Sequence, residues 1–135
     1  MDDATRELFE AALAAREQAY CPYSGYPVGA AVRTISGEIF SGCNVENAAY
    51  PVGNCAETSA LAAMVRAGER TIAEIVTVTA GPLPGTPCGA CRQRIREFAT
   101  PETMIHAVTV DGNVVTMTMQ QLLPISFGPE HLKAE

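Results

Sequence analysis

The stretch CAETSALAAMVRAGERTIAEIVTVTAGPLPGTPCGACRQRIREFA, residues 55–99, decides the fold of this chain. Residues 56–67 are rich in Ala, Leu and Met and stop at Gly68, which predicts a helix with a glycine at its C-terminal end. Residues 75–80 are apolar and β-branched and predict a strand, whereas residues 89–99 predict a second helix. This order of helix, strand and helix favours an α/β fold.

The flanking segments extend the same pattern. On the N-terminal side, residues 4–19 predict an amphipathic helix, and two strands at 26–34 and 38–43 are joined at Ser36-Gly37. On the C-terminal side the pattern predicts strands at 104–110 and 114–118, a turn at 111–113 and a helical turn at 120–123. Strands that alternate with helices predict a layered α/β domain around one mixed sheet.

Composition narrows the class of protein. A chain of 135 residues with 47% hydrophobic content predicts a single domain, residues 1–135, with a real core. The net charge of -6 repels a phosphate backbone, so a polynucleotide partner is not expected. The densest basic group is Arg92, Arg94 and Arg96, which we interpret as a solvated helix face.

Location and redox state follow from the same inspection. The sequence contains no run of roughly 18 apolar residues, so no membrane span is predicted. Its acidic start, Met1-Asp2-Asp3, is unlike a secretory signal. A cytoplasmic protein is therefore expected, in which thiols stay reduced. The odd number of 5 cysteines also fits poorly with a closed set of disulfides.

Two short motifs carry the chemistry, Cys55-Ala56-Glu57 and Pro87-Cys88-Gly89-Ala90-Cys91. Each begins a predicted helix, where unpaired N–H groups and partial positive charge stabilise a thiolate. Three thiolates suit zinc, and a set of three protein ligands leaves one position open, as in catalytic sites. We expect Cys43, His106 and His131 to be packed or surface residues and not a fourth ligand.

Glu57 lies two residues after a predicted ligand, in the first turn of the same helix. A carboxylate at this place usually does no more than interact with the helix dipole. Beside a zinc site it can move protons to and from the reacting water. The motifs therefore predict a zinc hydrolase with Glu57 as its proton shuttle.

Taken together, these motifs make the chain similar to the cytidine deaminase family, in its small homotetrameric form with a three-cysteine zinc. The resemblance covers nearly the whole chain. Its matching stretches are Pro22-Tyr23-Ser24, Val28-Gly29-Ala30-Ala31, Gly42-Cys43-Asn44-Val45-Glu46-Asn47-Ala48-Ala49-Tyr50, Cys55-Ala56-Glu57, Pro87-Cys88-Gly89-Ala90-Cys91-Arg92-Gln93, Leu122-Leu123-Pro124 and Phe127-Gly128. Cys-Ala-Glu with Pro-Cys-x-x-Cys marks zinc deaminases in general, and Asn-Val-Glu-Asn narrows the match to nucleosides.

The resemblance implies a three-layer fold with about five strands, and hydrolytic deamination of cytidine and deoxycytidine in pyrimidine salvage. It implies one zinc per subunit and a homotetramer with active sites shared between subunits. It implies that Asn44 and Glu46 bind the ribose, with loop capping as the alternative role for both. At the base, it implies that the Ala56 N–H binds the 2-oxygen, that the Thr86 backbone binds the 4-amino group, and that Tyr26 lies beside the ring. Phe127, Ala48 and Tyr50 would reach a neighbouring subunit's pocket.

Two positions depart from the family pattern. Thr58 stands where relatives often have an arginine that offsets thiolate charge, so another group has to balance the cluster; Arg92 or the helix dipoles are candidates, and Gln93 is also expected nearby. Tyr26 stands where Phe is common, and its hydroxyl could change the tolerance for substituted cytidines.

Three other functions remain open on this reading. A blasticidin-type deaminase of small molecules would share the zinc site and differ around the sugar. A non-enzymatic zinc module would need a fourth protein ligand. A polynucleotide deaminase is disfavoured by the acidic charge.

Overall fold

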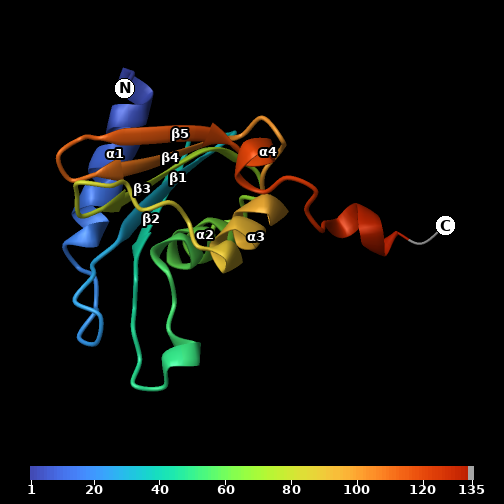
Figure 1. The fold of residues 1–135 in the computed structure, drawn as a ribbon. Coiled ribbons are helices and arrows are strands. Elements are labelled where there is room, and N and C mark those ends of the chain that lie inside the picture. The colour runs from blue at the N-terminus through green and yellow to red at the C-terminus, as the bar shows by residue number, and fades with distance from the viewer. Residues whose placement is uncertain (134–135) are drawn as a thin grey trace.

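The computed structural model describes residues 1–133, which form one mixed sheet covered by helices on both faces (Figure 1). The strands are β1 (Gly29–Thr34), β2 (Ile39–Cys43), β3 (Ile72–Thr79), β4 (Met104–Thr109) and β5 (Val114–Thr118), in the order β2-β1-β3-β4-β5. Only the β3–β4 pair among them is parallel. The predicted mixed sheet of about five strands is confirmed.

The helices make up the two outer layers. Helix α1 (Asp3–Arg16) packs on one face, and α2 (Ala56–Arg66) and α3 (Gly89–Glu97) pack on the other. Three short pieces complete the described helical structure: α4 (Met119–Leu122) and the 3-10 turns at Tyr50–Val52 and Pro129–Leu132. Within residues 1–133, none of the helices is long and apolar enough to cross a membrane.

Alternation along the central strands divides the core in two. Val32 and Ile75 are fully buried among residues of α2 and α3, whereas Ala31 and Val76 are fully buried against α1. Successive side chains of a strand point to opposite faces, so a strand between two helical layers is apolar throughout. This is why Ile75, Val76 and Val78 of β3 are all apolar and fully buried, although Glu74 before them is polar.

The strand and helix boundaries differ from the predicted ones in a few places. Strand β3 begins at Ile72, whose amide donates to the Phe98 carbonyl. Strand β1 begins only at Gly29, because the backbone of Tyr26 and Val28 bonds to the Asn44 side chain and does not join the sheet. Side-chain contacts of this kind leave no trace in the hydrophobic pattern.

Two glycines set how closely the helices approach the sheet. A Cβ atom added at Gly29 would lie 2.0 Å from the Ala12 carbonyl oxygen of α1, and one at Gly42 would lie 2.6 Å from the Ala60 nitrogen of α2. Backbone atoms cannot move aside for such a contact without shifting the helix. Gly42 therefore fixes the distance of α2, and with it the first predicted motif, from β2.

A polar cluster around Glu74 connects α1 to the sheet. Glu74 accepts hydrogen bonds from the Thr5 hydroxyl at 2.6 Å, from Arg33 at 2.6 Å and from His106 Nε2 at 2.7 Å. The other ring nitrogen of His106 is 2.8 Å from the Thr116 hydroxyl. His106 is thus the packed histidine that the sequence predicted. Burial by itself raises the pKa of Glu74, but the hydrogen bonds together hold this pKa below its usual value.

We predict a pH-dependent stability loss in Glu74→Gln. Because the folded-state pKa is lowered, the ionised carboxylate stabilises the fold above the unfolded pKa of about 4.3, and this contribution is lost as the pH falls through the folded pKa. The variant should be less stable than the wild type by about 1–3 kcal/mol at pH 7, with a gap that closes in acid. Urea unfolding across pH checks this, with exposed Glu10→Gln as control; a gap that stays constant into acid contradicts it.

Candidate metal centre and active site

The three predicted zinc ligands lie together at the starts of two helices. Cys55 is the N-cap residue of α2, Cys88 is the N-cap residue of α3, and Cys91 lies in the first turn of α3. Their Sγ atoms all lie within 4.8 Å of one another. In the part of the chain that the structure describes, no other group of three His, Cys, Asp or Glu side chains is placed to hold a metal ion.

The chemistry of this cluster fits zinc. A hydrogen bond between the Cys91 and Cys55 sulfurs lowers the pKa of Cys55, and the same bond together with burial raises the pKa of Cys91. Neither N-cap cysteine makes the usual capping hydrogen bond, so both sulfurs are available as ligands. Three sulfurs within 4.8 Å of one another suit zinc, and a set of three protein ligands leaves one position for a non-protein ligand.

Glu57 lies in the first turn of α2, two residues after Cys55, and is only 5% exposed. Burial raises the pKa of its carboxyl group. The Thr77 hydroxyl donates to Glu57 Oε2 at 3.5 Å and orients the carboxylate from the sheet side. A buried carboxyl group with a raised pKa can both accept and return a proton near neutral pH.

A cavity of about 330 Å³ opens beside the cluster. Eight of the predicted site residues line it: Tyr26, Asn44, Glu46, Cys55, Ala56, Glu57, Thr86 and Cys88. The sequence reading assigned no role in the site to the other five lining residues, Ser24, Val28, Thr77, Thr79 and Gly85. Thr77 and Thr79, at alternate positions near the end of β3, were the available signal for two of these, because such positions face the same side of a sheet.

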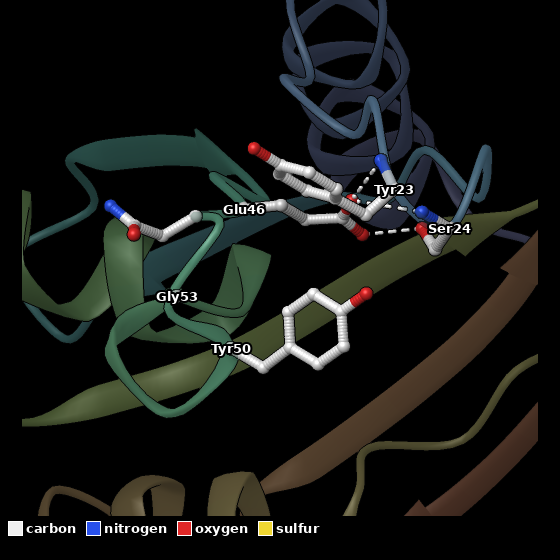
Figure 2. A pocket seen from close by; sticks show the side chains of 6 residues that line it. Tyr23, Ser24, Glu46, Tyr50 and Gly53 are labelled. Carbon is white, nitrogen blue, oxygen red and sulfur yellow. Dashed lines mark hydrogen bonds between the residues drawn. The ribbon is translucent and has the colours of Figure 1, made fainter.

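Asn44 and Glu46 line the cavity and also hold the neighbouring loop. Asn44 is buried, accepts from the Val28 amide at 2.9 Å and donates to the Tyr26 carbonyl at 2.9 Å. One Glu46 oxygen accepts from the Tyr23 and Ser24 amides at 3.0 Å, and the other accepts from the Ser24 hydroxyl (Figure 2). The loop-capping role that the sequence left as an alternative is therefore present in this structure.

A second pocket of about 290 Å³ adjoins the first and shares Ser24 and Glu46 with it. Figure 2 shows Tyr23 and Tyr50 in this pocket, with ring centroids 5.9 Å apart. Tyr50, which is 75% exposed, lines this second pocket and not the cavity beside the cysteines.

Two further predicted contact residues lie outside both pockets. Ala48 lines neither of them, and nor does Phe127. Phe127 is exposed and stacks on His131 with ring centroids 5.1 Å apart. Gln93 was expected near the zinc ligands; instead its amide donates to the Phe127 carbonyl at 2.9 Å and so anchors the C-terminal segment.

The interpretation of the α3 arginines as a solvated face holds only in part: Arg94 is exposed, Arg92 and Arg96 are half-buried, and each of the three also binds a protein group. Arg92, a candidate for balancing the thiolate charge, donates to the carbonyls of Pro87 and Leu122 and to the Thr86 hydroxyl. Arg96 pairs with Glu130 at 2.5 Å.

Two side chains that the sequence did not propose for charge balance contact the Cys91 sulfur. Arg94 Nη1 donates to Cys91 Sγ at 3.7 Å, and the Thr58 hydroxyl oxygen lies 4.0 Å from the same sulfur. The sequence reading placed Thr58 beside the cluster and missed Arg94.

Comparison with known proteins agrees with this geometry. Residues 2–107 match the family model for the cytidine and deoxycytidylate deaminase zinc-binding region. A cytidine deaminase of Sporosarcina psychrophila is 43% identical over 118 residues, which are 87% of each chain. The crystal structure of cytidine deaminase from Burkholderia pseudomallei has a TM-score of 0.87 and 44% identity, covering 94% of this chain and 100% of that one. The crystal structure of cytidine deaminase from Mycobacterium leprae has a TM-score of 0.77 and 38% identity, covering 91% of this chain and 99% of that one.

The fold and the three-cysteine cluster with its buried glutamate define a zinc-dependent deaminase. Within this class, the chain belongs to the cytidine and deoxycytidylate deaminase family.

We predict that the purified protein carries one zinc per chain and that Cys88→Ser loses it. Replacing a thiolate by a hydroxyl removes one of only three ligands, and Cys88 is exposed enough for the fold to tolerate the change. Metal content after dialysis measures the effect. Cys21→Ser, which changes a cysteine outside the cluster, should keep its zinc; equal zinc in both variants would show that the metal binds elsewhere.

Proposed function

We propose that this chain catalyses the hydrolytic deamination of cytidine and deoxycytidine to uridine and deoxyuridine, with release of ammonia, in pyrimidine salvage. The observation that carries the proposal is a single cavity lined by two of the clustered cysteines, the buried Glu57 and two polar residues from the Asn44–Glu46 segment. Relatives named cytidine deaminase support it, at 38–43% identity over most of the chain.

Cys55, Cys88 and Cys91 would hold the zinc, which when bound supplies a Lewis acid that makes water a nucleophile near neutral pH. Glu57 takes a proton from the attacking water and gives it to the ring N3 while a C–O bond forms at C4. It then carries the second proton of that water to the 4-amino group, and the C–N bond breaks to release ammonia. One carboxyl group can serve both steps because burial raises its pKa toward the working pH.

The remaining lining residues would orient the nucleoside. The Ala56 N–H at the start of α2 binds the 2-oxygen, and the Thr86 backbone carbonyl accepts from the 4-amino group. Arg92 supports this carbonyl's loop by its bonds to Thr86 and Pro87. At the sugar, Asn44 and Glu46 bind the ribose hydroxyls. They can do so while holding the loop, because a side-chain amide and a carboxylate each have more hydrogen-bond donors or acceptors than the loop contacts use.

We further propose a cytoplasmic homotetramer in which subunits complete each other's sites, each subunit acting as one catalytic domain. The C-terminal segment after α4 extends beyond the sheet (Figure 1) and is held to α3 by Gln93 and Arg96. Phe127 and Tyr50 expose 56% and 75% of their surface, and neither lines the cavity beside the cysteines. Exposed aromatics of this kind are typical of interfaces. Phe127, Tyr50 and Ala48 would then contact a nucleoside in the neighbouring subunit.

We predict that Glu57→Gln keeps its fold and zinc but loses activity by about 10²- to 10⁴-fold, because the amide cannot move protons. The loss of cytidine absorbance on conversion to uridine measures the rate, and Glu10→Gln is the control. A panel of cytidine, deoxycytidine, free cytosine and blasticidin S tests the substrate class. Undiminished activity in Glu57→Gln, or turnover of the antibiotic alone, contradicts the proposal.

Tyr26 gives a second test, on substituted cytidines. Its hydroxyl oxygen lies close to Gly85 in the cavity, since a Cβ atom added at Gly85 would be 2.8 Å from it. We expect Tyr26→Phe to change the rates on ring- and N4-substituted cytidines relative to cytidine, because the hydroxyl adds bulk and polarity at the cavity wall. Identical relative rates in the two proteins would show that the hydroxyl has no part in substrate choice.

A further inference from the structure

Arg94, which lines the groove between α2 and α3, contacts the cysteine cluster. It lies three residues after Cys91, a spacing at which side chains of a helix are neighbours. Its Nη1 donates to Cys91 Sγ at 3.7 Å, although Arg94 itself is exposed and the sulfur belongs to a fully buried residue. Arg92, one residue after Cys91, points elsewhere and bonds to carbonyls.

This contact answers a charge problem at the cluster. Three thiolates and one Zn²⁺ sum to about one net negative charge, in surroundings where an unbalanced charge is costly. Among residues 1–133, Arg94 is the only cationic side chain with a hydrogen bond to any of the three sulfurs. The Thr58 hydroxyl, 4.0 Å from the same sulfur, is neutral. A guanidinium stays charged at every working pH and donates well to a thiolate.

We propose that Arg94 is the positioning residue that balances the thiolate charge, acting through Cys91 to set how tightly the site holds zinc. The inference rests on the proposed zinc ligation by the three cysteines. On this inference α3 carries both the Cys88–Cys91 pair and the positive charge that balances it, in the pattern Cys-x-x-Cys-x-x-Arg from Cys88 to Arg94. It also explains how Thr58 can stand beside the cluster without a charge of its own.

The central experiment compares Arg94→Met with Arg66→Met. Both arginines line the same groove between α2 and α3, but Arg66 makes no bond to the cluster. Zinc affinity is measured by competition with a chromophoric chelator, and circular dichroism and the melting temperature of the apo-proteins report folding. Outer contacts to metal ligands typically change metal affinity by about 10- to 100-fold. We expect a loss of this size in Arg94→Met, a partial recovery in Arg94→Lys and no change in Arg66→Met.

Two further measurements separate charge from packing. Cobalt-loaded Arg94→Met should show a shifted thiolate-to-cobalt charge-transfer band, because the donor electrons of Cys91 lose their positive neighbour. Thr58→Arg in the Arg94→Met background should regain zinc affinity, because it supplies a guanidinium from α2 to the same sulfur.

The outcomes distinguish this inference from the proposed function. If the wild type binds no zinc, or if Cys88→Ser retains it, the zinc ligation itself is wrong. If the wild type binds zinc through the cysteines and Arg94→Met binds it equally well with an unchanged cobalt spectrum, the role of Arg94 is overturned. An affinity loss that neither Arg94→Lys nor the added Thr58→Arg recovers would also overturn it, because the effect would then be one of packing.

Discussion

The convergence of three sulfur atoms within 4.8 Å is the constraint on which the rest of this structure depends. Thiolates repel one another, and their ligand positions come from two helices that are separated in the sequence by a strand and a long loop. Both helix N-termini therefore have to be held at fixed places on one face of the sheet. Gly42, which lets α2 lie against β2, and the bonds of Arg92 to the loop before α3 serve that requirement.

The electrostatics of the site follow from the same arrangement. Helix N-termini favour negative charge, which suits the thiolates. Glu57 sits among them and is buried, so its carboxyl group holds a proton more readily than a free one does. Arg94 contributes to both groups, because it donates to Cys91 and its charge also tends to lower the pKa of Glu57. Glu57 and the three clustered cysteines therefore share one counter-charge.

Asn44 and Glu46 support the neighbouring loop and are also the residues that we propose for binding the sugar. Asn44 and Glu46 hold the loop of residues 23–28 by hydrogen bonds to its backbone. That loop in turn carries Tyr26 and Ser24 into the cavity wall. A change at Asn44 would therefore disturb the loop as well as any ligand contact, which explains why the sequence alone could not choose between capping and binding for these residues.

The sequence by itself determined the layered fold, the clustering of the three cysteines and the position of Glu57 beside them. Those features depend on short stretches of sequence: on the spacing of apolar residues, and on cysteines at helix starts, where unpaired backbone N–H groups favour a thiolate. Only the tertiary structure decided the partners of Arg92, Gln93 and Arg94, the use of Thr77 behind Glu57, and the loop contacts of Asn44. Each of these depends on which atom of another element, or of another helical turn, a polar side chain contacts. Such side chains have many rotamers, and only the packed fold selects one.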